Sequence, residues 1–563
     1  MSKLFERLLE ARGLDRSFLA PKYENLTDPF VLPDLDKAAD RINQAIAENE
    51  KILIYGDYDV DGVTASTVMA DALTLAGAHP EDIDIMLPDR FADGYGMSPC
   101  LITRAKKQGI TLVITVDCGS KNHAIIDELN TLKIDTIVTD HHECSTDLPN
   151  ALAVVNPKRP DFVEEKPNLK NLAGVGVAFK LAQGLVRKGI IPSGQEKWLL
   201  DLVLIGTICD NMLLTGENRI LGYYGVKVLA KTRRAGLKEL MNRARVKTLT
   251  AESIGFQIGP RLNAAGRLKS AHLSLDLLRA TSPTDAATLA EQLENLNAKR
   301  KTEQQNAIKE ITTRGISDDS VIIETGAWHE GILGIIAGRL VEDYHRPAFV
   351  LSEVENGIYK GSGRSFGDFN LAKALDFVKD TIIGGGGHAG AAGVRLDGKN
   401  LYAFREKINE YYKSLHLTGQ EDYLKNHADL DVYNLADLSL DFLEELKLLE
   451  PFGAGNEEPI FRLLDTDIIN VSRMGTEQNH LRLDIRDKKG NNLKLVAFYA
   501  PEKWLTLTPE DKVIPLIKLM ENDFNGVKSA EARIVDIEII SWYNQSIKEK
   551  PSRTTSLSFG LSS

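Results

Sequence analysis

Three carboxylates stand at alternate positions directly after an apolar run near the start of the chain. The segment KILIYGDYDVDG, residues 51–62, carries Asp57, Asp59 and Asp61. Like charges this close repel one another, and a divalent cation between them would remove the repulsion. Oxygen ligands are those that Mg²⁺ and Mn²⁺ prefer in proteins. This spacing therefore indicates metal-dependent chemistry.

Two later apolar runs, TLVITV and DTIVT, also end on possible metal ligands. The side chains that follow them are Asp117, Asp140, His141 and His142. Asp210, at the end of DLVLIGTICD, is a further candidate. A single Asp after a strand is usually a helix cap or turn residue. Because three runs end this way, we predict one metal site that collects these side chains.

The elements that would position these residues alternate between strands and helices. Short apolar runs occupy residues 51–55, 82–87, 111–116, 135–139 and 151–156. Helix-like stretches such as TASTVMADALTLAG separate them, a pattern typical of a parallel sheet covered by helices. Ligands of such sheets bind outside the carboxyl ends of the strands, and that is where the acids and histidines would lie.

The middle of the chain carries residues suited to phosphate rather than to metal. SPTD begins a predicted long helix that no Gly or Pro interrupts from Thr284 to Arg314. Its cations at 299–301 either contact DNA phosphate or lie on a solvated face. Beyond it, KGSGRS supplies Ser362 and Arg364, and GGGGHAGAAG supplies His388 among glycines that let backbone N–H groups approach an anion.

From about residue 425 the pattern changes to roughly five strands without long helices between them. This number fits a small OB-type barrel, a fold that binds single strands through stacking and a basic groove. Phe452, Phe498 and Tyr499 either stack on bases or fill the barrel core. The Ser/Thr-rich residues 546–563 are predicted to be disordered.

Composition narrows the class of protein. The chain has 563 residues, 43% of them hydrophobic, and a formal charge of −12, so we expect several domains and at most a local basic channel. Its four cysteines show no C-x-x-C spacing, which argues against a zinc finger or a disulfide framework. No signal-peptide pattern or membrane-length apolar run is present, and we expect a cytoplasmic protein.

The motifs carry a family resemblance. GDYDVDG, VDCG and TDHH resemble the successive motifs of the DHH phosphoesterase superfamily. RLNAAGRL, GGGGHAGAAG and LEPFGAGNEEPIF extend the resemblance over nearly the whole chain to its RecJ branch, the bacterial single-strand-specific exonucleases. One departure is Leu213, which stands where that family usually has a proline.

The resemblance implies an α/β fold. A parallel-sheet DHH catalytic domain is joined by a long helix to a smaller α/β DHH-associated domain, and a β-barrel OB-fold domain follows. The implied domains are an N-terminal segment packed on the catalytic domain (1–45), the DHH domain (46–270), the connecting helix (271–314), the DHH-associated domain (315–420), the OB domain (421–545) and the tail (546–563).

The resemblance also implies two divalent metal ions, Mn²⁺ or Mg²⁺. The implied ligands are Asp59, Asp61, Asp117, His141 and Asp210. Asp57 would ligate metal or orient the nucleophilic water, His142 would lie near the leaving oxygen, and Asp140 would position the histidines. The implied phosphate-binding residues are Arg90, Arg261, Arg267, Ser362, Arg364 and His388.

The implied activity is 5′-to-3′ hydrolysis of single-stranded DNA to 5′-mononucleotides, in DNA repair and recombination. One alternative is an oligoribonuclease or cyclic-dinucleotide phosphodiesterase, which would not need the C-terminal barrel. Another is a non-enzymatic replisome scaffold, which predicts lost ligands, whereas the set is intact here. The expected partner is single-stranded DNA, with a helicase and a single-strand-binding protein by resemblance. We expect a monomer without membrane association.

Overall fold

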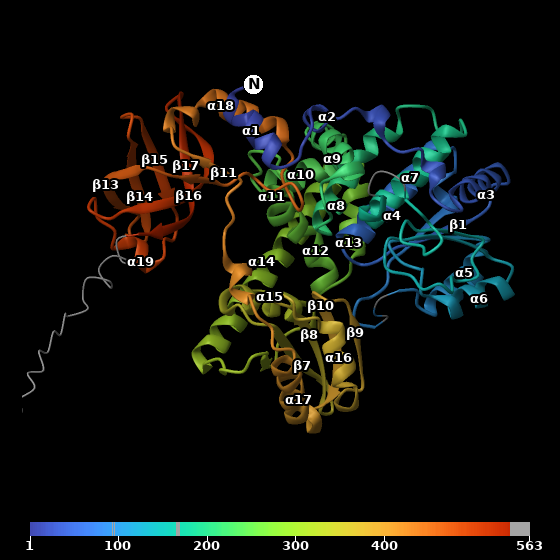
Figure 1. Cartoon of the computed structure of the whole chain (residues 1–563). Coiled ribbons are helices and arrows are strands. Elements are labelled where there is room, and N and C mark those ends of the chain that lie inside the picture. The colour runs from blue at the N-terminus through green and yellow to red at the C-terminus, as the bar shows by residue number, and fades with distance from the viewer. Residues whose placement is uncertain (93, 95, 165–168, 541–563) are drawn as a thin grey trace, which may run out of the picture. The chain divides into compact units, whose positions relative to one another are not determined.

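The structure is a computed structural model that describes residues 1–563 except 93, 95, 165–168 and 541–563. The chain forms two compact units (Figure 1). Met1–Pro21, Lys425–Phe452 and the chain from Glu457 onward make the first, and Lys22–Leu424 with Gly453–Asn456 makes the second. The tail predicted at 546–563 lies outside the described residues.

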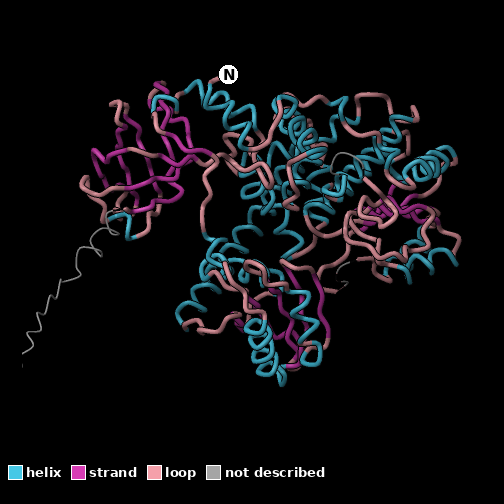
Figure 2. The backbone as a smooth tube through the Cα atoms, in the orientation of Figure 1, coloured by secondary structure: helices cyan, strands magenta, loops and turns pink. Residues whose placement is uncertain are grey.

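The second unit is built on a parallel sheet (Figure 2). Its strands are β1 (Ile52–Tyr55), β2 (Ile83–Met86), β3 (Leu112–Val116), β4 (Asp135–Thr139) and β5 (Ala153–Val155). They lie in the order β2-β1-β3-β4-β5, and every neighbouring pair is parallel. The predicted parallel α/β sheet is therefore confirmed.

Helices cover both faces of this sheet, which explains why its strands are apolar at nearly every position. Ile52 and Ile54 share one buried cluster with α3, α4, α7 and α8, whereas Leu53 and Tyr55 share another with α5 and α6. The helices of this region are α3 (Leu35–Ala47), α4 (Val60–Leu75), α5 (Cys100–Gln108), α6 (His123–Thr131), α7 (Gly174–Arg187), α8 (Leu200–Cys209), α9 (Gly216–Leu229), α10 (Ala235–Arg243), α11 (Ala251–Ser253), α12 (Gly259–Leu268) and α13 (His272–Arg279).

The connecting helix begins at the predicted SPTD and is shorter than the 271–314 segment assigned to it. It is α14, Pro283–Arg314, and α13 precedes it as a separate helix. The break has a local cause, because Ser282 is extended and its side chain accepts the Asp285 N–H as an N-cap, with Pro283 at the first helical position. Residues 271–282 thus belong to the packed helices of the catalytic region.

A second, mixed sheet follows the long helix. Its strands are β6 (Ile322–Thr325), β7 (Ala348–Glu355), β8 (Ile358–Arg364), β9 (Gly384–Gly387) and β10 (Ala391–Asp397), in the order β6-β7-β8-β10-β9. The accompanying helices are α15 (Leu333–Tyr344), α16 (Leu371–Phe377) and α17 (Leu401–Ser414). The all-glycine strand β9 lies at the edge and is exposed.

The first unit contains a seven-stranded sheet in the order β11-β12-β16-β17-β15-β14-β13. Its elements are α18 (Leu440–Leu446), α19 (Glu502–Leu505), β11 (Leu430–Val432), β12 (Phe461–Leu463), β13 (Thr466–Met474), β14 (His480–Asp487), β15 (Asn492–Ala497), β16 (Val513–Phe524) and β17 (Val527–Ile539). Strands β12 and β13 are separate because Asp465 turns the chain between them with a φ of 56°.

The N-terminal segment differs from the prediction that residues 1–45 pack on the catalytic domain. Only the part from Lys22 onward belongs to the catalytic unit. The preceding helices α1 (Lys3–Ala11) and α2 (Arg16–Leu19) belong to the other unit, where Phe5 packs edge-on against Phe442. The apolar face of α1 packs into the core of the C-terminal strands. This contact could not be predicted because its two sides are more than 400 residues apart in the sequence.

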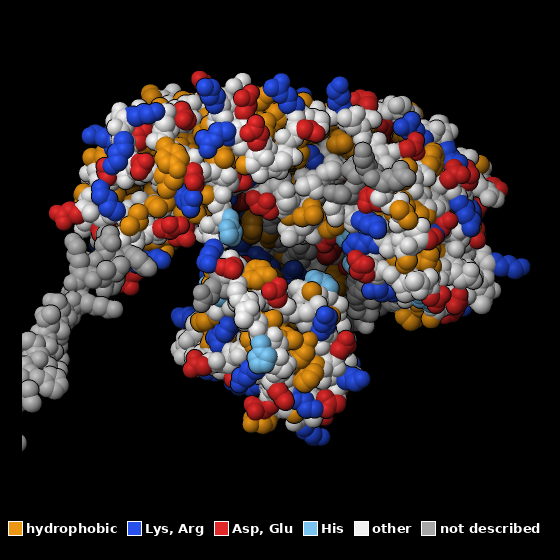
Figure 3. All heavy atoms as spheres, in the orientation of Figure 1, with side chains coloured by type: hydrophobic (Ala, Val, Ile, Leu, Met, Phe, Trp, Pro, Cys, Tyr) orange, Lys and Arg blue, Asp and Glu red, His pale blue; other side chains and the backbone are white. Residues whose placement is uncertain are grey.

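Acidic and basic side chains are interspersed over the visible face (Figure 3). Within the described ranges, we find no helix with the length and apolarity needed to cross a membrane.

Candidate metal centre and phosphate site

The candidate metal centre lies at the carboxyl ends of three adjacent strands. Asp57 follows β1 after one glycine, Asp117 follows β3 directly, and Asp140 follows β4 directly. The strand order reverses direction between β1 and β3, and open α/β sheets bind their ligands at such a switch point.

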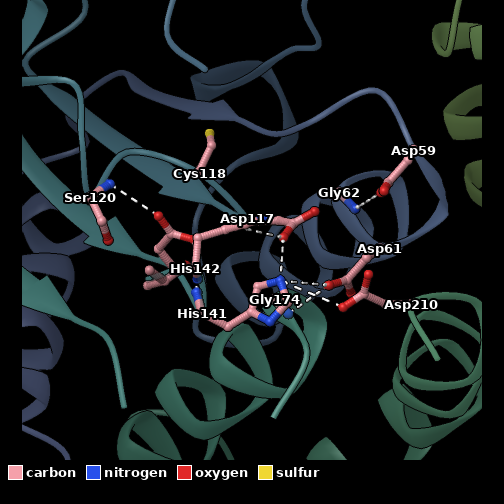
Figure 4. Close-up of polar contacts among 12 residues, drawn as sticks. Asp59, Asp61, Gly62, Asp117, Cys118, Ser120, His141, His142, Gly174 and Asp210 are labelled. Carbon is pink, nitrogen blue, oxygen red and sulfur yellow. Dashed lines mark hydrogen bonds and ion pairs between the residues drawn. The ribbon is translucent and has the colours of Figure 1, made fainter. Parts of the chain in front are cut away.

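Two helix N-termini orient the acids that follow β1. Asp59 is the N-cap of α4 and accepts the Gly62 N–H at 3.0 Å. Asp61 accepts the N–H groups of Gly174 and Val175, at the start of α7, at 2.6 and 2.9 Å (Figure 4). The positive end of a helix dipole stabilises a carboxylate, so the fold fixes these oxygens before any ligand binds.

Glycine is required where α7 begins. A Cβ on Gly174 would lie 2.5 Å from the Asp117 Cβ and 2.7 Å from its Oδ1. Asp117 itself has a φ of 61°, a left-handed conformation that side chains seldom adopt. The close approach of α7 to β3 therefore depends on a residue without a side chain.

His141 joins the carboxylates from separate elements. Its Nε2 lies 3.1 Å from Asp117 Oδ1, 3.6 Å from Asp210 Oδ2 and 3.8 Å from Asp61 Oδ2 (Figure 4). Asp210 reaches this point from the C-terminus of the buried helix α8. His141 is almost fully buried, so the cluster is largely shielded from water.

The ligand atoms form three overlapping groups, each with its atoms within 4.8 Å of one another. The groups are Asp57–Asp59–Asp117, Asp117–His141–His142 and Asp61–His141–Asp210. Asp117 and His141 each occur in two groups. The structure thus brings together all five predicted ligands with Asp57 and His142, in an arrangement that suits two adjacent cations sharing ligands.

Asp140 lies beside these groups and holds the histidine segment. One of its oxygens accepts the Ser120 N–H at 3.0 Å, and the other lies 2.9 Å from Nδ1 of His142. Burial works against ionisation, yet His142 and the backbone keep the pKa of Asp140 below its usual range. Burial alone would lower the pKa of His142, but the Asp140 carboxylate raises it by more.

The electrostatics of the protein side chains alone are unfavourable for several negative charges in this cluster. Burial, followed by the Asp59 carboxylate, raises the pKa of Asp57 to about 8 and that of Asp210 to about 7. Burial also lowers the pKa of His141 to about 3, so its ring is neutral. Among the described residues, none of the five clustered aspartates forms an ion pair with Lys or Arg.

This donor set fits divalent cations. The Oδ1 atoms of Asp57 and Asp117 are buried and accept no hydrogen bond from the described residues. Buried carboxylate oxygens without donors are costly unless a cation compensates them. Carboxylates with one or two imidazoles suit Mn²⁺ or Mg²⁺ better than a structural zinc ion.

A group of guanidinium ions lies near the acids. Arg90 stacks over Tyr58, with 4.9 Å from its Cζ to the ring centroid, and Arg267 donates to the Gly331 carbonyl at 3.2 Å. Arg364 donates to Ser362 Oγ at 3.1 Å. Burial and the charges of Arg90 and Arg364 lower the pKa of Arg267. Within the described chain no carboxylate pairs with these three arginines, as expected of an anion site.

The two remaining residues predicted to bind phosphate differ in whether another residue occupies them. His388 lies among its glycines and is only partly covered by other residues. This partial burial, together with the charges of Arg364 and His142, lowers its pKa. Arg261 differs from the prediction, because Glu294 of α14 binds its guanidinium at 2.5 and 3.1 Å. That carboxylate occupies the donors a phosphate would need.

Two cations of α14 are also occupied. Arg300 is buried and donates to Asn297, whereas Lys299 pairs with Glu303.

Two residues near the site were not predicted. Asn156 is fully buried and donates to Ser120 Oγ at 2.9 Å and to the His142 carbonyl at 3.0 Å, so it fixes the loop after β4. Lys158 follows it, and its charge contributes to lowering the pKa values of His141 and His388. Both lie in NPKRPD, residues 156–161, a segment without residue types that indicate catalysis.

Three family models match successive parts of the chain. The DHH family, N-terminal domain, matches residues 51–207, the DHHA1 domain matches 318–414, and the RecJ OB domain matches 430–536. Their order agrees with the two sheets of the catalytic unit and the sheet of the C-terminal strands.

Curated relatives match over almost the full length. The single-stranded-DNA-specific exonuclease RecJ of Bacillus subtilis is 35% identical over 96% of this chain and 69% of its own. The protein of the same name from Escherichia coli is 32% identical over 95% of both chains.

Solved structures agree with the fold. The crystal structure of RecJ from Thermus thermophilus in complex with Mn²⁺ matches with a TM-score of 0.80 and 29% identity, over 95% of this chain and 75% of that one. The complex of the same protein with Mg²⁺ matches with a TM-score of 0.75 and 27% identity, over 95% and 74%.

Proposed function

Because the chain belongs to the RecJ family of single-stranded-DNA-specific exonucleases, we propose that it hydrolyses single-stranded DNA from the 5′ end to 5′-mononucleotides. The observation that supports this most is the set of three overlapping ligand groups, linked through Asp117 and through His141, with unpaired arginines nearby. A phosphodiester needs both charge neutralisation and a poised water for hydrolysis, and this arrangement supplies the residues for each.

The clustered residues would hold two divalent ions, Mn²⁺ or Mg²⁺. When bound, the ions neutralise the phosphate, lower the pKa of water and stabilise the departing oxygen. Asp59 and Asp61 would hold them from the start of α4, Asp117 and His141 from the ends of β3 and β4, and Asp210 from the end of α8.

Asp57 and His142 are suited to the two places where the reaction moves a proton, the attacking water and the leaving O3′. The free Oδ1 of Asp57 can orient the attacking water by accepting its hydrogen bond. Asp140 holds His142 through Nδ1 and raises its pKa, so the ring can carry a proton for the leaving O3′. Asp140 acts only through that histidine.

Arginines and glycine-rich backbone would hold the phosphates. Arg267, Arg364, Ser362 and His388 are placed to bind the phosphate next to the metal centre. Arg90, stacked on Tyr58 beside Asp57, is suited to a 5′-terminal phosphate. Binding that terminus at a fixed distance from the metals would set both the direction of hydrolysis and its step of one nucleotide.

The C-terminal strands offer stacking surfaces for the strand that has not yet reached the site. Phe498 and Tyr499 are 59% and 79% exposed, whereas Phe452 packs against the core. Tyr499 has a φ of 53°, and its N–H donates to His480 Nδ1 at 3.0 Å. A strained, exposed aromatic pair fits base stacking rather than core packing.

The biological setting is proposed from the family alone. DNA repair and recombination generate single-stranded ends that such an enzyme would consume. A helicase that exposes these ends and a protein that coats single strands are the proposed partners. We propose that the enzyme acts as a monomer in the cytoplasm, where bacterial DNA lies.

The test compares three substrates with Mn²⁺ and with a chelator: a 5′-phosphorylated single strand, its blunt duplex and a dinucleotide. Metal-dependent release of mononucleotides from the 5′ end of the single strand, with the duplex spared, is the expected result. Turnover confined to the dinucleotide would instead place the protein with the small-substrate phosphodiesterases.

Asp117→Ala should abolish this turnover while the fold is retained, because Asp117 belongs to two of the three ligand groups. Asp127→Ala is the matched control, since Asp127 is exposed on α6 away from the cluster. Circular dichroism would establish that both variants fold, and wild-type rates in Asp117→Ala would refute the assignment.

A further inference from the structure

A dense run of positive charge occurs at the end of α9 and around α10 (Figure 1). Glu239 is the only carboxylate between residues 227 and 247. The cations of this run are Lys227, Lys231, Arg233, Arg234, Lys238, Arg243, Arg245 and Lys247. The chain as a whole has more acids than bases, so the run is a local reversal of charge.

Two of these cations are neutralised within the fold. Arg234 forms ion pairs with Asp71 at 2.7 Å and Asp201 at 3.3 Å. Arg243 pairs with Glu239 at 2.7 Å. The other six are exposed, and in the described part of the chain no carboxylate forms an ion pair with any of them. We call these six the α9–α10 basic surface: Lys227, Lys231, Arg233, Lys238, Arg245 and Lys247.

Folding stability does not account for the whole surface. The negative end of a helix dipole favours cations, and that explains Lys227 in the last turn of α9 and Arg245 just beyond α10. Arg233 and Lys238 flank the N-terminus of α10, where the dipole disfavours positive charge. The helix dipole therefore does not explain these two cations, which leaves them available to a ligand.

Aromatic rings hold two of the cations in place without neutralising them. The guanidinium of Arg233 lies 3.6 Å from the ring centroid of Trp198, and the ammonium of Lys227 lies 3.6 Å from that of Tyr223. Such contacts limit side-chain freedom and leave the N–H donors available. The cost of ordering these side chains on a ligand is reduced accordingly.

The chemistry of the surface favours a phosphate backbone over a protein. Protein interfaces depend on large apolar or aromatic anchors, and the two large hydrophobic side chains exposed at the ends of this region, Leu213 and Phe256, are not among the residues of the surface. Binding to nucleic-acid backbone requires only cations that replace condensed counterions. A single strand longer than the catalytic site supplies a repeating polyanion.

We propose that the α9–α10 basic surface binds the phosphate backbone of DNA outside the catalytic site. This inference rests on the proposed function, which supplies the DNA. It adds a second contact that serves long substrates and not short ones. The surface would raise affinity for the strand without taking part in its hydrolysis.

The test uses the full chain with Arg233→Gln, Lys238→Gln and Lys247→Gln combined. The matched control combines Lys37→Gln, Lys106→Gln and Lys107→Gln, which removes the same charge from exposed lysines of α3 and α5. Affinity for a single strand of about 60 nucleotides is measured with chelator over a range of salt, and each lost phosphate contact lowers the slope against log salt by about 0.7. Hydrolysis of a hexanucleotide with Mn²⁺ is measured separately.

The expected result is a slope reduced by about 2 and affinity for the long strand at least tenfold weaker in the first variant only. Hexanucleotide hydrolysis should stay within twofold of the wild type in both variants. An unchanged slope, or an equal loss in the control, would overturn the proposal. Loss of binding to polyglutamate with unchanged DNA binding would assign the surface to an acidic protein. Failure of hexanucleotide hydrolysis in the wild type would instead count against the proposed function.

Discussion

The buried carboxylates make the metal centre a source of proton linkage. Asp57 has a pKa raised to about 8 and Asp210 one raised to about 7, both above the ordinary value of 3.8 in an unfolded chain. The metal-free folded protein therefore holds protons that the unfolded chain has released. Between about pH 4 and pH 8 the folded protein binds more protons than the unfolded chain. Its free energy of unfolding therefore falls as pH rises through this range.

Mn²⁺ should reverse that loss, since it binds the deprotonated carboxylates and displaces their protons. The increase in Tm on adding Mn²⁺ should be larger at about pH 8.5 than at about pH 5.5. Thermal unfolding with Mn²⁺ and with chelator at both pH values measures it. In Asp117→Asn the increase should be small at either pH, and an increase independent of pH in the wild type would contradict the linkage.

Arg364 should contribute mainly to binding. It has no carboxylate partner in the described chain, so Arg364→Ala leaves no unpaired acid and removes one charge-assisted phosphate contact. The affinity for single-stranded DNA should weaken by about 1.5–3 kcal/mol. Binding with chelator at several salt concentrations measures this loss and the accompanying change in salt dependence.

Arg339→Ala is the control for that measurement, because Arg339 lies on α15 in the same region and pairs with Asp343 at the surface. An Arg364→Ala variant with wild-type salt dependence would argue against a direct phosphate contact.

The clustering of the candidate ligands could be predicted at this scale, because each lies within a few residues of the end of a strand or helix in a short motif. Arg261 could not, since the carboxylate that occupies it, Glu294, is 33 residues away on another helix. The role of Asn156 could not be predicted either. An Asn that is buried and fixes a loop cannot be distinguished in sequence from an Asn in a surface turn. Local spacing predicts what a residue offers, and packing decides what it contacts.

At the level of elements, the start of α7 is as important as the ligands. Its N–H groups hold Asp61, and Gly174 lets it approach Asp117. Gly174→Ala should displace either α7 or Asp117, destabilise the protein by about 1–3 kcal/mol and weaken Mn²⁺ binding. Thermal unfolding with and without Mn²⁺ separates the two effects.

Gly338→Ala provides the comparison. Gly338 lies within α15, and nothing approaches the position of an added Cβ within 4 Å. This change should be neutral or slightly stabilising, since Ala is the better helix former. Equal metal affinity and stability in both variants would show that α7 tolerates a side chain at its start.

The strands were predictable because burial on both faces makes them continuously apolar. The start of α14 was predictable too, because Ser282 and Pro283 are typical of an N-cap and a first helical position. The separate helix α13 was not, since residues 272–279 have helical composition and the implied connecting helix includes them. The same limit applies to α1, whose amphipathic pattern predicts a buried face and says nothing about which core receives it.

At the scale of the molecule, the chain passes between the two compact units more than once. Met1–Pro21 belongs to the unit of the C-terminal strands, and Gly453–Asn456 belongs to the catalytic unit, where the Leu214 N–H donates to the Ala454 carbonyl at 2.7 Å. A truncation after Leu424 therefore does more than remove the C-terminal strands. It also removes the core that α1 packs on.

A fragment of residues 1–424 should consequently self-associate, whereas one of residues 22–424 should stay monomeric. The first exposes Leu4, Phe5, Leu8 and Leu9 of α1, and the second begins inside the catalytic unit. Light scattering after gel filtration compares them. In the 1–424 fragment, Phe5→Ser with Leu8→Ser should restore the monomer, and equal behaviour of the two unmodified fragments would contradict the assignment of α1.

The packing of Phe5 against Phe442 also has a consequence for synthesis. Ribosomes add about 5–20 residues per second, so the first helix of the protein waits roughly 20–90 s for its partner to be made. During that time its apolar face is available to chaperones. A chain that stops before Phe442 never covers this face, so exposed α1 would distinguish a truncated chain from one that includes the C-terminal strands.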